Sequence, residues 1–199
     1  MVLMGFEVRP ERPADRAAVR RVVTAAFGAD DPGHGDEVAQ IWESLGHHRR
    51  VGLVVEERGV VLGHVGLSRA WVDARRELVE VWVLSPLSVV PGRQRAGIGT
   101  ALVAAAVEAA RGSGVPALFL EGSPFYYGTR AFERADRRGF LPAALERTPR
   151  AAFQVVVFAS HEPWMTGQLV YPSVWWEHGA AGLRDPGLAE LEARFASLE

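Results

Sequence analysis

The stretch from residue 78 to residue 120 constrains the fold of this 199-residue chain most. An apolar run at 78–90 leads through a loop at 91–96 into an Ala-rich helical pattern at 97–111, and a short apolar run follows at 115–120. A strand, a helix and a second strand in this order form a crossover between parallel strands. The sequence therefore predicts one βαβ unit with a Gly- and Arg-containing loop at the start of its helix.

Strand and helix patterns flank this unit on both sides. Before it we expect a strand at 6–9, helices that begin near Pro13 and at Asp36, and a hairpin of strands at 51–56 and 60–71; after it we expect a helix at 127–138, strands at 153–159 and 168–171, and an amphipathic helix at 186–198. A hairpin sheet joined to a single crossover predicts an α+β fold with a mixed, mostly antiparallel sheet and flanking helices. We expect a main domain at 1–172 and a C-terminal extension at 173–199.

Composition excludes several kinds of site. The chain has no cysteine, which excludes disulfides, thiol nucleophiles and cysteine metal ligands, and its 6 histidines lack metal-ligand spacing, so we expect no metal. A net charge of -2 provides no basic field for nucleic acid or anionic membrane. The N-terminal residues show no signal-peptide pattern, and no apolar run is long enough to span a bilayer. We therefore expect a cytoplasmic protein with neither nucleic-acid nor membrane partners.

The loop before the central helix is typical of an anion-binding site. The first N–H groups of a helix have no partner within the helix and favour an anion. Gly97 and Gly99 remove side chains where a phosphate would touch the backbone, and Arg93 and Arg95 add positive charge. A P-loop is excluded because it needs a Lys after its last Gly, and the chain has no Lys. A Rossmann fingerprint is disfavoured because Leu102 stands where the third Gly belongs.

The pattern Gln94-x-x-Gly97-x-Gly99, preceded by Leu87-x-Val89-x-Pro91, resembles the acyl-CoA-binding motif of the GNAT superfamily of N-acetyltransferases. The resemblance covers about residues 6–171. It implies a GNAT-like fold and acetyl-CoA as the co-substrate, with its pantetheine arm paired along the strand and its pyrophosphate on the loop. The cofactor-binding residues that it implies are Leu87, Ser88, Val89, Gln94, Arg95, Ala96, Gly97, Ile98, Gly99 and Thr100.

The resemblance also implies a reaction, in which an amine attacks the thioester directly in a ternary complex. The acceptor amine stays open among a small amine, an amino acid, an antibiotic and a protein N-terminus. Two other functions stay open as well. One is a catalytically silent CoA-binding sensor or partner subunit, and the other is a nucleotide-binding oxidoreductase.

Residues 122–127 resemble a bacterial subgroup with Gly-His-Pro-x-Tyr-Tyr at this place, although Ser123 replaces the His. Many relatives carry a Tyr five residues before the Phe of a Gly-Phe pair; that Phe is Phe140 here, and the position holds Ala135. We therefore expect Tyr127, or Tyr126, to protonate the departing thiolate.

Glu121 ends a predicted strand at the expected cleft and is a candidate base, although an exposed strand-end carboxylate is more often a solvated residue. Glu80 on the long strand is a weaker candidate.

Two further features carry expectations. Ser85-Pro86 interrupts the long apolar strand and predicts a bulge, because Pro cannot donate to the ladder. Trp164, Trp175 and Trp176 flank the last predicted strand, where a homodimer interface, a wall of the acceptor site and ordinary packing are all open.

Overall fold

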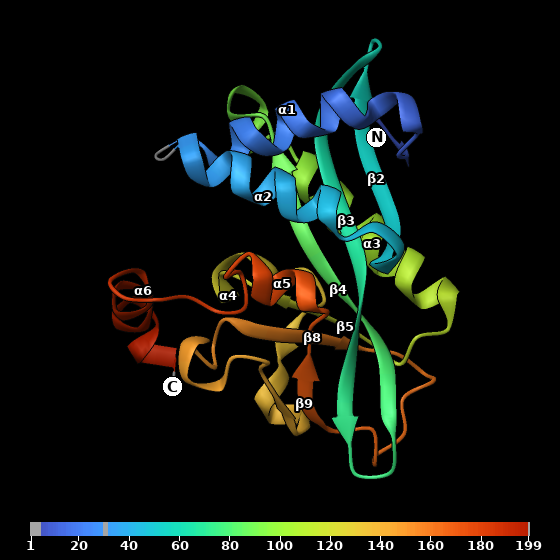
Figure 1. Cartoon of the computed structure of the whole chain (residues 1–199). Helices are drawn as coiled ribbons and strands as arrows, with labels where there is room; N and C mark the ends of the chain where they lie inside the picture. The colour runs from blue at the N-terminus through green and yellow to red at the C-terminus, as the bar shows by residue number, and fades with distance from the viewer. Residues whose placement is uncertain (1–4, 30–31, 199) are drawn as a thin grey trace. The chain divides into compact units, whose positions relative to one another are not determined.

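The computed structural model describes residues 5–29 and 32–198. Its helices and strands are, in chain order, β1 (Glu7–Pro10), α1 (Arg16–Phe27), α2 (Pro32–Ser44), β2 (Arg49–Glu57), β3 (Val60–Ala74), β4 (Leu78–Val89), α3 (Ile98–Ser113), β5 (Ala117–Glu121), α4 (Pro124–Tyr127), β6 (Glu133–Arg134), β7 (Phe140–Leu141), β8 (Phe153–Val157), β9 (Gly167–Val170), α5 (Ser173–Glu177) and α6 (Gly187–Phe195) (Figure 1). Most of these elements were predicted from the sequence, within a few residues at their ends.

The strands follow the order β1-β2-β3-β4-β5-β8-β6, and β9 pairs with both β3 and β7. The β4–β5 and β7–β9 pairs are parallel, whereas the pairs β1–β2, β2–β3, β3–β9, β5–β8 and β6–β8 are antiparallel. Helix α3 connects β4 to β5, which is the predicted βαβ crossover. The predicted α+β fold with a mixed, mostly antiparallel sheet is therefore confirmed.

The chain divides into two compact units. The first comprises Met1–Ser68 and Leu84–Ala109, and the second comprises Arg69–Val83 and Ala110–Glu199. Strands β3 and β4 each contribute one part to each unit. The predicted division at residues 172 and 173 stays a prediction.

In the first unit, opposite faces of β3 pack against different helices. A side chain at Gly66 would collide with the Trp42 ring of α2, and the His64 ring lies 5.1 Å from that ring. A side chain at Gly63 would instead collide with Ile98 of α3. Because neighbouring strand residues point to opposite faces, α2 covers the even-numbered side of β3 here and α3 covers the odd-numbered side.

Helix α2 begins earlier than the sequence predicted. Asp36 was expected to cap it, but the helix begins at Pro32, and Asp36 lies one turn inside. Proline fits the first turn of a helix because its missing N–H needs no partner there. Asp36 instead accepts a hydrogen bond of 3.3 Å from the Thr24 hydroxyl of α1, so it links the two helices, which lie side by side (Figure 1).

The core of the second unit forms around β5. The Phe119 ring stacks on Phe153 of β8 at a centroid distance of 5.4 Å and meets the edge of Phe140 at 4.9 Å. The parallel pairs between β4 and β5 are Trp82–Leu118 and Val83–Phe119. Ser85 and Pro86 lie beyond these pairs, and the predicted bulge there stays a prediction.

The helix predicted at 127–138 is wrong. Helix α4 ends at Tyr127, and Glu133 and Arg134 pair with Val155 and Gln154 of β8. Beyond Tyr127, the predicted span is helical only in the short 3-10 turn Ala135–Arg138, which Gly139 ends at a φ of 82°. Pairing with β8 and burial of Phe132 override the helical pattern of the sequence, as tertiary contacts commonly do.

The predicted C-terminal amphipathic helix is confirmed as α6. Its Phe195 is buried against Ala151 and Ala152, and Leu191 packs against the same cluster. Among the residues that the structure describes, no helix is both long enough and apolar enough to cross a membrane.

Candidate functional site

The predicted anion-binding loop lies in the first unit, between β4 and α3. The loop (residues 90–97) begins with a hydrogen bond of 3.0 Å from the Val90 N–H to the Leu62 carbonyl, and a 3-10 turn at Pro91–Arg93 reverses the chain. Arg95 and Gly97 both have positive φ, of 63° and 83°. Such angles are uncommon outside glycine and tend to persist at sites where the backbone serves a ligand.

The N–H groups at the start of α3 are available to an anion. The first backbone bond of the helix runs from the Ala101 N–H to the Gly97 carbonyl at 3.0 Å. In residues 5–29 and 32–198, no acceptor is recorded for the N–H of Ile98 or Gly99. Two donors at the positive end of a 16-residue helix are what an anion-binding site at this loop requires, and the binding of an anion there stays a prediction.

Close packing fixes the start of α3. Ile98 and Leu102 are buried against β3 at Gly63, where a Cβ atom would lie 2.8 Å from an Ile98 methyl group and 3.2 Å from the Ser88 carbonyl. Gly63 therefore lets the first turn of the helix lie directly on the strand. The sequence analysis did not identify Gly63, because nothing in its local pattern marks this contact.

The two arginines of the loop have different partners. Arg93 forms a bidentate ion pair with Glu57 at 2.6 and 2.9 Å, so its charge is bound to β2 rather than left for a ligand. The Arg95 side chain is exposed and has no recorded partner in the described part of the chain. The sequence led us to expect two positive charges for an anion at this loop. Only the charge of Arg95 therefore remains available.

The other predicted cofactor-binding residues also lie in the first unit. Leu87, Ser88 and Val89 form the end of β4, and Gln94 reaches back to the Val89 carbonyl at 3.4 Å. Ala96 and Thr100 are exposed, the first in the loop and the second in the first turn of α3. All ten residues thus belong to one continuous segment, and their contacts with a cofactor stay a prediction.

Glu121, the candidate base, lies in the second unit at the end of β5. The Tyr171 hydroxyl donates to one oxygen of its carboxylate at 2.9 Å, and the Thr148 hydroxyl donates to the other at 3.2 Å. We call Glu121, Thr148 and Tyr171 the Glu121 cluster. Burial raises the pKa of Glu121, while these two hydrogen bonds and the charge of Arg147 oppose the rise. Two hydroxyl groups therefore hold the Glu121 carboxylate in place, and its affinity for a proton is higher than that of a carboxylate at a solvated strand end.

The two candidate acids lie next to this cluster in the chain. The rings of Tyr126 and Tyr127 meet edge to face at 4.9 Å, and a side chain at Gly122 would collide with the Tyr127 ring. Burial raises the pKa of Tyr127, so its hydroxyl keeps its proton at neutral pH. That hydroxyl makes no recorded hydrogen bond within the described residues. It can therefore donate to a ligand, and its role stays a prediction.

The three tryptophans have separate environments in the second unit. Trp175 is buried and stacks on Tyr171 at 5.0 Å, whereas Trp176 is 46% exposed, with the Arg147 guanidinium 6.0 Å from the centre of its ring. Trp164 donates to Glu162 at 2.9 Å. Packing accounts for Trp175, and the roles of Trp164 and Trp176 stay open.

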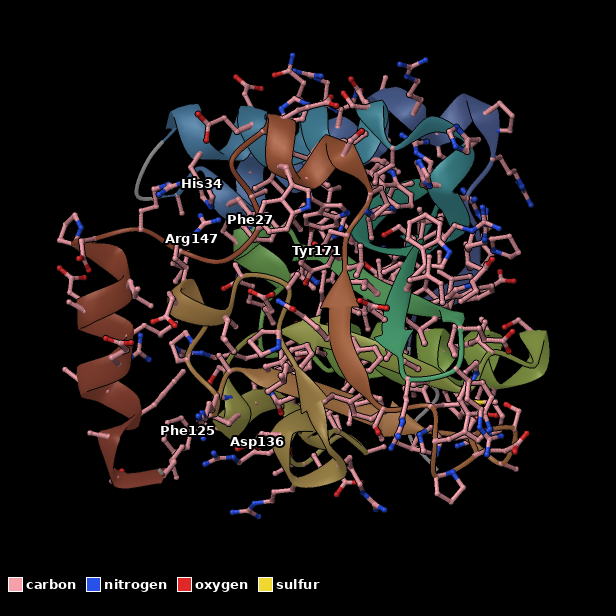
Figure 2. The ribbon with its side chains drawn as sticks, turned by 60° about the horizontal axis from the view of Figure 1, so that its bottom comes forward. Phe27, His34, Phe125, Asp136, Arg147 and Tyr171 are labelled. Atoms are coloured by element: carbon pink, nitrogen blue, oxygen red, sulfur yellow. The ribbon has the colours of Figure 1, made fainter. Side chains whose placement is uncertain are left out.

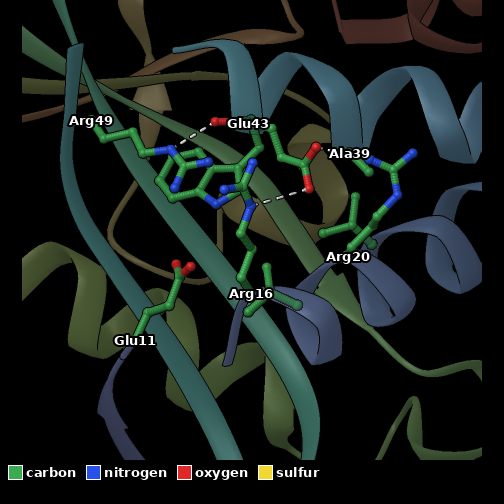
Figure 3. A pocket seen from close by; sticks show the side chains of 9 residues that line it. Glu11, Arg16, Arg20, Ala39, Glu43 and Arg49 are labelled. Carbon is green, nitrogen blue, oxygen red and sulfur yellow. Dashed lines mark hydrogen bonds and ion pairs between the residues drawn. The ribbon is translucent and has the colours of Figure 1, made fainter. Parts of the chain in front are cut away.

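Two polar features outside these sites hold ion pairs. Glu80, the weaker candidate base, forms an ion pair with Arg69 at 2.5 Å. In the first unit, a pocket between α1, α2 and β2 contains the Arg20–Glu43 ion pair at 2.8 Å and the hydrogen bond from Arg49 to the Trp42 carbonyl (Figure 3). The pocket has room for about one water molecule, so it is a structural feature rather than a substrate site.

Three known proteins that resemble this chain over most of its length are acetyltransferases by name. The uncharacterized N-acetyltransferase YjhQ of Escherichia coli K12 is 26% identical over 171 residues, which cover 85% of this chain and 93% of that protein. A GNAT family acetyltransferase from Brucella melitensis, solved in complex with acetyl-CoA, is 28% identical with a TM-score of 0.67 and covers 85% of this chain and 97% of that one. YhbS, a GNAT family N-acetyltransferase from Escherichia coli solved in complex with CoA, is 23% identical and has the same fold, with a TM-score of 0.74 over 89% of this chain and 96% of that one.

The family assignment rests on the sequence itself. The pattern of the Acetyltransferase (GNAT) family matches residues 16–140, which include β4, the loop and α3 as well as Glu121 and both candidate tyrosines. Because this match spans more than half of the chain and the relatives agree with it, the chain belongs to the Acetyltransferase (GNAT) family and is an acetyltransferase.

Proposed function

We propose that this protein transfers the acetyl group of acetyl-CoA to an amine by direct attack of the amine on the thioester. The observation that carries the proposal is the start of α3, where two N–H donors without partners follow a loop with two left-handed residues. The acetyl-CoA and CoA held by the Brucella and YhbS relatives support CoA as the group that carries the acyl chain.

The loop would hold the pyrophosphate of the co-substrate. The N–H groups of Ile98 and Gly99 donate to phosphate oxygens, and the exposed Arg95 adds a positive charge. The backbone at the end of β4 would pair with the amides of the pantetheine arm as an added strand does. These interactions position the thioester and leave the chemistry to other residues.

Glu121 and Tyr127 would handle the protons. The amine nitrogen forms a bond to the thioester carbon, the carbon–sulfur bond breaks, and the electron pair leaves with sulfur. Glu121 takes the proton of the amine, for which its raised pKa suits it, and Tyr127 gives its proton to the thiolate. The products are an N-acetyl amide and free CoA.

Release of free CoA with a panel of amines tests the proposal. The chain has no cysteine, so a thiol reagent added to the reaction detects CoA alone. We expect CoA release that depends on both protein and amine, with a matching amount of acetylated amine by mass spectrometry. A protein that binds acetyl-CoA in calorimetry but releases no CoA with any amine would instead be the silent sensor.

A further inference from the structure

The Arg147 guanidinium has no hydrogen-bond acceptor among the described residues. It lies in the 3-10 turn Leu145–Arg147 of the second unit and is labelled with Tyr171 in Figure 2. Its Nη1 atom is buried and has no hydrogen-bond partner, and within residues 5–29 and 32–198 its guanidinium forms no ion pair. Buried guanidinium N–H groups nearly always have an acceptor, because leaving one unpaired is costly. This arrangement therefore indicates an acceptor from outside the chain.

The surroundings of Arg147 place it beside the Glu121 cluster. Its neighbour in sequence, Thr148, donates to Glu121, and the charge of Arg147 acts on that carboxylate. The Arg147 guanidinium also lies 6.0 Å from the ring centre of Trp176, whose neighbour Trp175 stacks on Tyr171. Contacts or adjacency in the chain therefore link Arg147 to Trp176, Trp175, Tyr171, Glu121 and Thr148. We call these six residues the corner; it contains one cation without an acceptor and one carboxylate on which that cation acts.

Some residues of the corner are buried, and others are partly or fully exposed. Thr148, Tyr171 and Trp175 are buried, so the side chains behind it cannot move freely. Trp176 is exposed, and Glu121 and Arg147 are only partly buried. Part of each of these residues therefore faces solvent, while the Nη1 atom of Arg147 itself is buried.

We propose that this corner binds an acceptor that carries a carboxylate as well as the reactive amine, that is, an amino acid. Arg147 binds the carboxylate through its N–H groups, and Glu121 receives the amine and its proton. The carboxylate takes no part in bond making: the amine nitrogen still forms the bond to the acetyl carbon, and CoA still leaves. The inference rests on the proposed acetyl transfer and specifies its acceptor.

Matched acceptors test the assignment. Each of the standard amino acids is compared with its primary amide, which has the same side chain and amine but no carboxylate. With the parent protein we expect the best amino acid to exceed its amide about 10- to 100-fold in kcat/KM, which is the effect of charge-assisted hydrogen bonds to a guanidinium. Equal kcat/KM for the two forms overturns the proposal.

The substitution Arg147→Gln identifies the residue responsible. It should raise KM for the amino acid by about 10- to 100-fold and abolish the preference for the amino acid over its amide, because only the amino acid has a carboxylate for Arg147 to bind. The control Arg137→Gln removes an exposed arginine of the same unit and should keep the preference. If Arg147→Gln instead weakens acetyl-CoA binding in calorimetry and spares the amino acid preference, the anion belongs to the donor and the proposal is wrong.

Equilibrium binding decides the assignment even if no acceptor turns over. N-acetyl amino acids and N-acetyl amino acid amides are titrated into the protein saturated with CoA. If the carboxylate form binds more tightly than the amide form, and Arg147→Gln abolishes this difference, the corner is supported as an amino acid site. If no acceptor is turned over in the same preparation, the proposed acetyl transfer has failed while the amino acid site stands. Equal binding of the two forms, or a preference that survives Arg147→Gln, refutes it.

Discussion

The predicted anion-binding loop and the Glu121 cluster use different parts of the polypeptide. The loop offers backbone N–H groups from one continuous segment, and its shape depends on the positive φ of Gly97 and on the absence of a side chain at Gly63 of β3. The cluster offers side chains that hydrogen bonds hold in place. A backbone site cannot be lost by deleting a functional group, but it can be blocked by adding one. A side-chain site is instead lost when its functional group is removed.

Removing a functional group should have its largest effect at Glu121. The substitution Glu121→Gln keeps the size of the side chain and can still accept from Tyr171 or Thr148, but it cannot take a proton. We expect kcat/KM to fall by about 10²- to 10⁴-fold with acetyl-CoA affinity unchanged, measured by CoA release and calorimetry. Glu192→Gln on the exposed face of α6 is the control and should retain full activity.

The pH profile sharpens this prediction. The pKa of Glu121 is raised by burial, so a base at this position is lost as pH falls, and it is lost at a pH above that expected for an exposed carboxyl group. The parent protein should therefore show an acid limb in kcat/KM that is absent from Glu121→Gln. The base is misassigned if the same limb persists in the variant.

Adding a group should have its largest effect at the loop. The substitution Gly99→Asp places bulk and negative charge at the N–H groups that would bind the pyrophosphate. We expect acetyl-CoA affinity to fall about 100-fold or more in calorimetry. Gly112→Asp adds the same group at the other end of α3, where a side chain meets nothing within 4 Å, and should bind acetyl-CoA as the parent does. Unchanged affinity of Gly99→Asp would contradict the assignment of the loop.

A smaller effect is expected at Tyr127. The substitution Tyr127→Phe keeps the ring against Gly122 and removes only the hydroxyl. Because the thiolate is a stable leaving group, kcat should fall near the lower end of the range for general acids, roughly 100-fold, with unchanged acetyl-CoA affinity. Tyr126→Phe is the matched comparison. If neither variant changes kcat, the thiolate leaves without a tyrosine acid.

The smallest effect concerns the support of the loop. In Gly63→Ala the new methyl group must displace Ile98 or Leu102, at a cost of about 1–3 kcal/mol in the free energy of unfolding. We expect a melting temperature a few degrees lower and acetyl-CoA affinity reduced a few fold. Gly112→Ala meets no neighbouring atom and should be neutral or slightly stabilising. Equal behaviour of the two variants would show that the close packing at Gly63 does not position the loop.

The loop could be predicted from the sequence because its parts are neighbours in the chain. Strand, turn, glycines and helix occur in one run, and each contributes through its local conformation. The Glu121 cluster could be predicted only at Glu121 itself, since Thr148 and Tyr171 are 27 and 50 residues away. Arg147 carried no local signal, because what distinguishes it is a missing partner. The prediction of a helix at 127–138 was wrong for a related reason. The helical pattern lies within that segment, whereas the strand β8 with which the segment pairs is distant in the sequence.

The contact at Gly63 also has a consequence for exchange with solvent. No side chain separates the first turn of α3 from β3, so that turn cannot open without uncovering Ile98 and Leu102, both buried in the first unit. The hydrogen-bonded amide of Ala101 should therefore exchange its hydrogen at a rate close to those of β3, although it lies next to a surface loop, whereas the Ile98 and Gly99 amides, which have no acceptor among the described residues, should exchange without any opening of the turn. An empty donor site would then already have the rigidity of its occupied form, and binding would need little ordering of the backbone.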